Sequence, residues 1–472
     1  MALIKTKTIA TLGPASKTIK TVSELIDAGV DVFRINMSHF KNEYDFEKIV
    51  KIIRKQSLVK KKYIGILVDL AGPKIRLDLS SIGESISIEK DKNYSLGFSD
   101  NSDIKINAKI DFKKISLQDA FVKIDDGKIV FKILRKQDDN LIIKAMDDGI
   151  IIDRKGVNFP GVELNVESLT KNDRQHLSLA VKNDIDWVAL SFIRESKDIK
   201  PILRIYKKEG FSIPVIAKIE KPEAIQNLDS IIDVFDGILI ARGDLGVEMS
   251  LAKLPSLQKL IIEKCKNAKK PVIIATQMLE SMIENPTPTR AEVNDVANAV
   301  YEGADAVMLS GETAVGRYPV NTVQIMQEIL LDAEEEIGQK DISSDMPDEI
   351  GGDIRSAIGE SVKLISRHLN IDAIVVMTES GSTAIVVSHY RPRNNIFALT
   401  PSKSTCNRLS LVWGVIPLLT KQFESTDQMI VESEKILQKE GLLKKGDTFV
   451  LTSGVPVAVT GSTNMLRIHK IS

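Results

Sequence analysis

Eight short runs of β-branched and other apolar residues recur along the first two thirds of the chain, most of them separated by helix-length segments. The predicted strands cover residues 6–11, 32–37, 63–70, 187–191, 214–220, 237–241, 271–277 and 306–310. Most lack alternation of apolar and polar residues, as expected for parallel strands that are covered on both faces. Eight strand–helix units predict an α/β fold that closes into a TIM (β/α)8 barrel.

Two regions fall outside this pattern. Residues 71–186 separate the third predicted strand from the fourth and contain strand-like runs at 85–89, 121–124, 128–134 and 141–145. They predict a small β-barrel domain inserted in a loop at the catalytic end of the barrel, where it can act as a lid. A polar stretch at 341–353 predicts a linker, and runs at 373–378, 396–400, 415–419 and 448–452 predict a second α/β unit. We therefore assign residues 1–72 and 155–339 to the barrel, 73–154 to the inserted lid and 340–472 to a C-terminal α/β domain.

Charge and cysteine content exclude several classes. Lys plus Arg and Asp plus Glu each number 64 in 472 residues, so there is no basic excess for nucleic acid or a membrane surface, and we expect neither as a partner. Cys265 and Cys406 lie far apart and offer neither a disulfide framework nor a zinc motif. The first residues lack a signal-peptide pattern, and no apolar run reaches the roughly 18–20 residues of a membrane span. We expect a cytoplasmic protein.

The carboxyl ends of the predicted strands carry polar and charged residues, at the positions where barrel enzymes place their working groups. These residues are Arg34, Asn36, Ser38 and His39; Asp69; Ser191 with Phe192; Lys218 and Glu220; Arg242, Gly243 and Asp244; Thr276; and Ser310 with Glu312. Polar strand ends are common, because such ends are exposed. Successive ends that combine acids with Arg and Lys indicate a site.

The residue types at these ends favour phosphoryl transfer. Glu220 and Asp244, on neighbouring strands, are plausible oxygen ligands for Mg²⁺ or Mn²⁺. Arg34, Arg76 and Lys218 supply positive charge for a multiply anionic substrate. Phosphoryl transfer depends mainly on positioning and charge neutralisation, which this set provides.

The same residues stand in motifs that resemble the pyruvate kinase family, in the same order over essentially the whole chain. The motifs are TLGPAS at 11–16, RINMSH at 34–39, AKIE at 217–220, ARGDLG at 241–246, ATQMLESM at 275–282, PTRAE at 288–292 and MLSGETA at 308–314. The resemblance implies an enzyme that transfers the phosphoryl group of phosphoenolpyruvate to ADP, giving pyruvate and ATP, in the last step of glycolysis.

The resemblance also implies a role for each site residue. Glu220 and Asp244 would hold the metal, and Lys218 and Arg34 would contact the phosphoryl group. The remaining assignments are Arg242, Gly243, Asp244, Thr276, Ser191, Phe192 and Arg76 for substrate binding, Thr276, Ser310 and Glu312 for proton relay to the enolate carbon, and His39, Asn36, Arg76 and Lys155 for the nucleotide side.

A monovalent-cation site is also implied, at the equivalents of Asn36, Ser38, Asp69 and the Leu70 carbonyl. Family members that bind K⁺ there typically carry Glu at the position of Lys74. An ammonium on a flexible stem can supply the charge of a bound monovalent ion. We therefore predict that K⁺ is not required, with Lys74 as its substitute; the alternative is that Lys74 points into solvent and K⁺ still binds.

The C-terminal domain is implied to regulate the enzyme and to assemble a homotetramer. Its segment with Thr378, Ser380, Gly381, Ser382 and Thr383 follows a predicted strand and opens a predicted helix. Such a segment can bind the phosphate of a phosphorylated effector, although an ordinary N-capped loop has the same pattern.

Two other functions remain open from the residues alone. One is a different barrel enzyme that uses phosphoenolpyruvate or an enolate. The other is an inactive relative that senses metabolites, which would be expected to lack Lys218, Glu220 or Asp244; all three are present.

Overall fold

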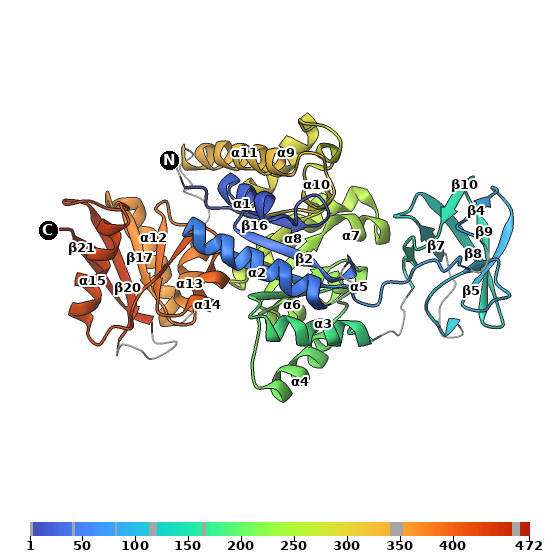
Figure 1. Cartoon of the computed structure of the whole chain (residues 1–472), viewed down its shortest axis with the longest axis horizontal. Helices are drawn as coiled ribbons and strands as arrows, with labels where there is room; N and C mark the ends of the chain where they lie inside the picture. The colour runs from blue at the N-terminus through green and yellow to red at the C-terminus, as the bar shows by residue number, and fades with distance from the viewer. Residues whose placement is uncertain are drawn as a thin grey trace.

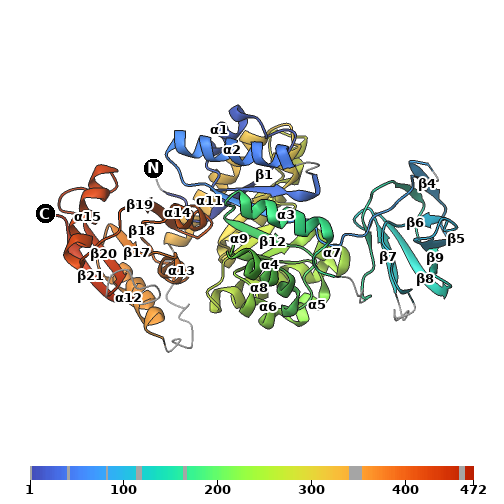
Figure 2. The same cartoon turned by 60° about the horizontal axis from the view of Figure 1, so that its bottom comes forward.

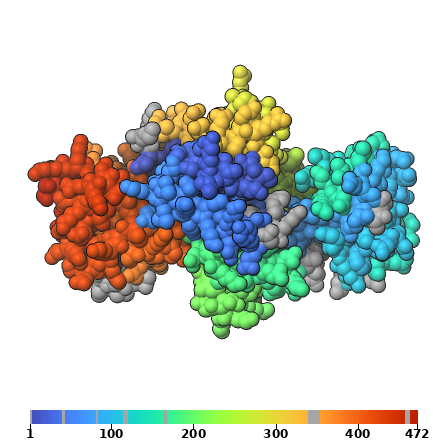
Figure 3. Space-filling view, viewed as in Figure 1, coloured from blue at the N-terminus to red at the C-terminus, as the bar shows by residue number. Residues whose placement is uncertain are grey.

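The computed structural model describes residues 3–39, 43–80, 83–112, 120–162, 167–339, 353–455 and 463–472. Phe40, which follows His39, and the predicted linker before Asp353 lie outside these residues. The molecule is elongated, with a central barrel, a β domain at one end and an α/β domain at the other (Figures 1 and 2). In the space-filling view the two outer domains lie on either side of the barrel (Figure 3). No helix among the described residues is both long and apolar enough to cross a bilayer.

The central domain is a closed parallel barrel, in the order β1-β16-β15-β14-β13-β12-β3-β2. Its strands are β1 Lys7–Leu12, β2 Val32–Asn36, β3 Gly65–Leu70, β12 Trp187–Leu190, β13 Val215–Ile219, β14 Gly237–Ala241, β15 Val272–Ala275 and β16 Ala306–Leu309. Nearly all of their residues are buried, because helices cover the outside and side chains fill the inside. The eight predicted barrel strands are confirmed.

Helices cover the barrel, and most of them contribute buried apolar side chains to the core around it. They are α1 Ile19–Ala28, α2 Glu43–Lys60, α3 Lys171–Lys182, α4 Lys200–Glu209, α5 Pro222–Gln226, α6 Leu228–Val234, α7 Arg242–Glu248, α8 Leu254–Asn267, α9 Arg290–Glu302, α10 Gly311–Ala314 and α11 Pro319–Gln339, with 3-10 turns η1 Met37–His39, η3 Ser196–Ile199, η4 Leu251–Lys253 and η5 Glu280–Ile283. Capping boxes start α3 at Thr170 and α9 at Thr289, where the hydroxyl accepts the amide three residues on.

The segment after β3 forms the predicted β insertion. One sheet has the order β11-β7-β8-β9-β5-β6 and a second pairs β10 with β4. The strands are β4 Ser85–Ile88, β5 Asn93–Gly97, β6 Ile104–Lys105, β7 Phe121–Ile124, β8 Ile129–Gln137, β9 Asn140–Ala145, β10 Gly149–Ile152 and β11 Val157–Asn158. Its buried residues form a separate core that includes Val157, Phe159 and Val162, so the β domain extends past residue 154, the boundary predicted from the sequence. The chain enters through Gly72, whose φ of +66° favours glycine, so the backbone can turn there against Ser191.

The C-terminal domain is a five-stranded sheet in the order β19-β18-β17-β20-β21, parallel except for β21. Its elements are α12 Ile354–His368, β17 Ala373–Met377, α13 Ser382–His389, β18 Ile396–Thr400, α14 Lys403–Leu409, β19 Val415–Leu419, α15 Thr426–Lys439, β20 Thr448–Gly454 and β21 Thr463–Lys470. The four predicted strands are present. β21 is an additional edge strand whose largely polar, exposed sequence lacks a clear strand pattern.

The C-terminal domain closes the amino end of the barrel. Leu411 is fully buried and belongs to the same apolar cluster as the side chains inside the barrel, among them Leu67 and Trp187. The Trp187 indole N–H donates to the Arg408 carbonyl at 3.2 Å. The β domain follows the carboxyl end of β3, so the two outer domains occupy opposite ends of the barrel (Figure 1). The carboxyl ends of the barrel strands therefore face the β domain.

Candidate active site

Arg34, in β2, is buried and fixed by two neighbours. Its Nε and Nη2 donate to Oδ2 of Asp69 at 2.8 and 2.6 Å, and its Nη1 donates to the Thr11 hydroxyl at 3.0 Å. Asp69 lies opposite Asn36 in the β2–β3 register, so the two strands bring Asp69 and Arg34 to the same end. Burial alone would raise the pKa of Asp69, but Lys218 and Arg34 lower it.

Lys218, on β13, is buried among three acceptors. Its Nζ lies 2.8 Å from Oε1 of Glu220, 3.3 Å from Oδ1 of Asp69 and 2.8 Å from the Ser191 hydroxyl. Burial favours the neutral amine, but the carboxylates of Asp69 and Glu220 outweigh it and raise the pKa of Lys218. The ammonium is therefore charged and held in a fixed position.

The two predicted metal ligands follow adjacent strands. Glu220 comes directly after β13 and accepts the Phe192 amide at 2.8 Å with Oε2. Asp244 lies in the first turn of α7, after β14, and its Oδ1 is 3.4 Å from Nζ of Lys74. No group of three or more His, Cys, Asp or Glu side chains suited to a metal occurs among the described residues. A two-carboxylate site fits Mg²⁺, which usually takes one or two protein carboxylates and completes its shell with water and substrate oxygens.

Arg242 and Thr276 shape the wall next to Asp244. The Arg242 guanidinium donates to Asp295 at 2.7 Å and to the Thr276 carbonyl at 2.8 Å. The Gly243 amide donates to the Thr276 hydroxyl at 2.7 Å. The Arg242 side chain and the Gly243 backbone therefore both contact Thr276, the first at its carbonyl and the second at its hydroxyl.

Backbone strain gathers at these strand ends. Thr276 has φ of 71°, Gln277 of 55° and Phe192 of 57°. Positive φ is rare outside glycine and unusual for a β-branched residue such as threonine. Strain of about 1–3 kcal/mol for each such residue is characteristic of functional sites.

Ser310 and Glu312 follow β16. The Glu312 carboxylate is fully buried and accepts the Ser310 amide at 2.6 Å and the Leu279 amide at 3.2 Å. It therefore ties the end of β16 to the segment after β15, which carries Thr276.

The predicted nucleotide-side residues are more dispersed. Arg76 donates to the Arg154 carbonyl at 2.9 Å, and Lys155 pairs with Asp125 at 2.8 Å, so both side chains bind the β domain. The Asn36 side chain accepts the Ser38 amide at 3.1 Å. The His39 backbone ends η1, and its side chain is not among those that the structure describes. The Leu70 carbonyl accepts the Ser191 hydroxyl at 2.7 Å.

Among the described residues, three side chains of the β domain bind α7. Besides Lys74 to Asp244, the Lys123 ammonium donates to the Val247 carbonyl at 2.6 Å, and the Asn158 amide donates to Glu248 at 2.8 Å. A hollow of about 40 Å³ lies at this junction, lined by Pro73, Lys74, Ile75, Val157, Asn158, Phe159, Val162, Phe192, Arg194, Lys221 and Glu223.

The predicted effector segment lies far from these residues, in the C-terminal domain. The Gly381 amide donates to the Thr378 hydroxyl at 2.9 Å, and α13 begins at Ser382. The Thr383 hydroxyl is 2.6 Å from that of Thr463. The Thr405 hydroxyl of α14 donates to the Glu379 carbonyl at 2.8 Å, so the first turn of α14 meets the segment.

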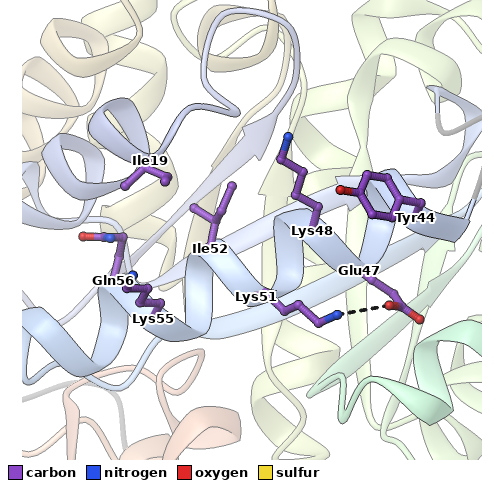
Figure 4. A pocket seen from close by; sticks show the side chains of 8 residues that line it. All are labelled: Ile19, Tyr44, Glu47, Lys48, Lys51, Ile52, Lys55 and Gln56. Carbon is purple, nitrogen blue, oxygen red and sulfur yellow. Dashed lines mark hydrogen bonds and ion pairs between the residues drawn. The ribbon is translucent and has the colours of Figure 1, made fainter.

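A further hollow lies outside the barrel, between α1 and α2, and measures about 260 Å³ (Figure 4). It is lined by Ile19, Tyr44, Glu47, Lys48, Lys51, Ile52, Lys55 and Gln56, and Lys51 pairs with Glu47 at 3.2 Å. None of the site residues predicted from the sequence lines this hollow.

Two parts of the site were not predicted. Asp69 was assigned only to the monovalent-cation region, yet it binds both Arg34 and Lys218. The Glu248 carboxylate, at the end of α7, binds Lys221 at 2.6 Å and Asn158 at 2.8 Å. The sequence offers a signal for Asp69, because an acid inside an apolar strand needs a cationic partner.

The closed barrel, with cations and carboxylates at its strand ends and a β domain inserted after the third strand, defines an enzyme of the (β/α)8-barrel class. Residues 3–323 match the model of the pyruvate kinase barrel domain, and residues 356–469 match that of the pyruvate kinase alpha/beta domain. The chain belongs to the pyruvate kinase family, whose members are phosphoryl-transferring kinases.

Individual relatives agree with this assignment. A pyruvate kinase of Geobacillus stearothermophilus is 40% identical, over 99% of this chain and 80% of that protein. One from Staphylococcus epidermidis is 37% identical with the same coverage. The solved structure of a pyruvate kinase from Cryptosporidium parvum superposes with a TM-score of 0.91 and 32% identity, over 99% of this chain and 96% of that one.

Proposed function

We propose that this chain transfers the phosphoryl group of phosphoenolpyruvate to ADP. The bond between phosphorus and the enol oxygen breaks, a bond to a terminal phosphate oxygen of ADP forms, and the enolate takes a proton at carbon to give pyruvate. The observation that carries the proposal is the buried, charged Lys218 ammonium beside Asp69 and Glu220, with Arg34 bound to the same aspartate. These cations are positioned before the substrate arrives, which is the contribution that phosphoryl transfer requires.

Glu220 and Asp244 would hold Mg²⁺ or Mn²⁺, which supplies charge neutralisation at the substrate oxygens. The Gly243 amide and the Thr276 hydroxyl now bind each other at 2.7 Å, and we assign both to the substrate carboxylate. Arg242 serves this site through its backbone, and Ser191 and Phe192 border it.

We assign the proton relay to Thr276, Ser310 and Glu312, and the nucleotide side to His39, Asn36, Arg76 and Lys155. Arg76 and Lys155 are anchored on the β domain, so the approach of that domain to the barrel would bring them toward the nucleotide.

The test is pyruvate formation, followed with a lactate-dehydrogenase-coupled assay containing phosphoenolpyruvate, ADP and Mg²⁺. We expect turnover that needs all three components. Absence of turnover would favour the inactive, metabolite-sensing relative. Consumption of phosphoenolpyruvate without ADP would favour a different barrel enzyme.

We further propose that K⁺ is not required. The Lys74 side chain is 30% exposed, and its ammonium lies inside the site, at Asp244, in support of the role of cation substitute. Activity should be equal with Na⁺ or K⁺ at matched ionic strength. Lys74→Glu should create a dependence on K⁺, and a large K⁺ activation of the unaltered enzyme would contradict the proposal.

We propose that Thr378, Ser380, Gly381, Ser382 and Thr383 bind the phosphate of an effector. The exposed Ser380 hydroxyl and the first turns of α13 and α14 support an anion site there. A phosphorylated metabolite should shift substrate saturation, and Ser382→Asp should abolish the shift. If no metabolite acts and Ser382→Asp is silent, the assignment is wrong.

We propose a homotetramer of 52.2 kDa chains in the cytoplasm. The two buried free cysteines support a reducing compartment. Sedimentation should give four times the chain mass, and a monomer alone at micromolar concentration would contradict the assembly.

A further inference from the structure

The two predicted metal ligands each carry an ammonium group, but the two ion pairs differ. Lys218 lies 2.8 Å from Glu220 and keeps two other acceptors, Asp69 and Ser191. Lys74 lies 3.4 Å from Asp244, and no other carboxylate among the described residues is within ion-pair distance of it. Lys218 can therefore remain in place when a cation binds Glu220, whereas Lys74 depends on Asp244 alone.

The position of Lys74 is set by its surroundings. Gly156, just before β11, passes so close that a Cβ there would lie 3.3 Å from Cε of Lys74. The backbone thus directs the side chain toward α7. Lys74 also borders the small hollow at the junction, which gives the ammonium space to move without unfolding the hinge, defined here as residues 71–75 between β3 and the β domain.

We propose that Lys74 is a built-in competitor for the divalent cation at Asp244. The cation and the Lys74 ammonium both bind the Asp244 carboxylate, and like charges at such short range repel. Binding of the cation therefore releases the ammonium, and binding of the ammonium opposes the cation. The pair is partly exposed and long, which makes it weak enough to exchange. This inference rests on the proposed metal site.

The exchange couples the metal to the substrate anion and to the β domain. Once released, the Lys74 ammonium remains tethered by the hinge beside the site and is available to an incoming phosphate. Its release also removes one contact between α7 and the β domain, while those of Lys123 and Asn158 persist. Release of Lys74 would therefore prepare the anion site and loosen the hinge together.

The first measurement is Mn²⁺ affinity without substrate, from the electron paramagnetic resonance signal of free Mn²⁺. Lys74→Met should bind Mn²⁺ about 3- to 10-fold more tightly than the unaltered protein, and Lys74→Arg should restore weaker binding. Lys123→Met, which removes another contact with α7, should leave the affinity within about 2-fold. Equal affinity of Lys74→Met and the unaltered protein would overturn the proposal.

The second measurement is acylation of Lys74 by an amine-reactive reagent, followed by peptide mass spectrometry. Mn²⁺ should raise the Lys74 labelling rate in the unaltered protein. In Asp244→Asn the rate should already be high and should not respond to Mn²⁺. A Lys74 rate that Mn²⁺ leaves unchanged in the unaltered protein would overturn the exchange.

The two proposals fail differently. If Asp244→Asn binds Mn²⁺ as well as the unaltered protein does, the metal-site assignment is wrong, and the inference fails with it. If Asp244→Asn loses Mn²⁺ but Lys74→Met gains nothing, the metal site stands and only the competition is overturned.

Discussion

At the scale of single residues, the account depends on charges that stay ionised although they are buried. Lys218 remains an ammonium because Asp69 and Glu220 offset the cost of removing it from water. Asp69 in turn stays ionised because it binds Lys218 and Arg34 together. Each of these charges is stabilised by the opposite charges beside it, so removal of one leaves its partners uncompensated.

We predict that Lys218→Met lowers kcat by about 10²- to 10³-fold or more, because it removes a preorganised cation from the point where negative charge develops. Circular dichroism should remain that of the unaltered enzyme. Lys7→Met is a matched control, because Lys7 is also a buried lysine but donates to the Val415 carbonyl at the other end of the barrel. Near-normal turnover of folded Lys218→Met would remove Lys218 from the mechanism.

The sequence predicted most of these residues but not their contacts. Lys218 lies near the carboxyl end of β13, and Glu220 and Asp244 follow buried strands, so their placement at one end follows from a parallel barrel. The binding of Asp69 to both Arg34 and Lys218 depends on the relative register of β2, β3, β12 and β13, which local patterns do not specify. The Lys74 contact depends on the path of the hinge past Gly156.

At the scale of elements, buried apolar runs were predicted well and polar strands were not. The strand at 121–124 has the predicted bounds, because its alternating side chains match a half-buried strand. β21 was missed, because an edge strand with one solvent face can be largely polar. The packing of Leu411 could not be predicted from its own segment either, because Leu411 contacts side chains inside the barrel, which is another domain.

We predict that Leu411→Ala lowers the free energy of unfolding by about 2–5 kcal/mol, because it leaves a cavity where the C-terminal domain seals the barrel. Leu419→Ala, at a leucine that is 45% exposed in β19, should cost less than about 0.5 kcal/mol. The melting temperatures of the two variants, compared with that of the unaltered protein, test this prediction. Equal melting temperatures would contradict the sealing role.

At the scale of the whole molecule, the barrel separates two sets of tasks. The β domain and the proposed catalytic residues share one end, while the C-terminal domain with its proposed effector segment occupies the other. His389, at the contact between barrel and C-terminal domain, is buried near Asp305, Arg391 and Lys269. Burial and the two cations lower its pKa to about 4, although Asp305 acts in the opposite direction.

Acid should therefore weaken this contact. In the unfolded chain His389 takes a proton near pH 6.5, whereas in the folded protein it does so only near pH 4. The stabilisation is complete above pH 6.5 and is lost as the pH falls from 6.5 to 4, because only the unfolded state gains a proton there.

We predict that the unaltered protein loses about 1–3 kcal/mol more unfolding free energy than His389→Gln over this interval. Melting temperatures of the two proteins at several pH values test this prediction. Parallel pH profiles for both proteins would exclude His389 as the cause.

The central claim is direct transfer of the phosphoryl group at the Lys218 site, and phosphorus NMR follows it without a coupling enzyme. With phosphoenolpyruvate, ADP and Mg²⁺, the phosphoenolpyruvate resonance should disappear as the γ-phosphate resonance of ATP appears in equal amount, and Lys218→Met should show neither change on the same timescale. Release of inorganic phosphate in place of ATP, or equal ATP formation by folded Lys218→Met, would contradict the account.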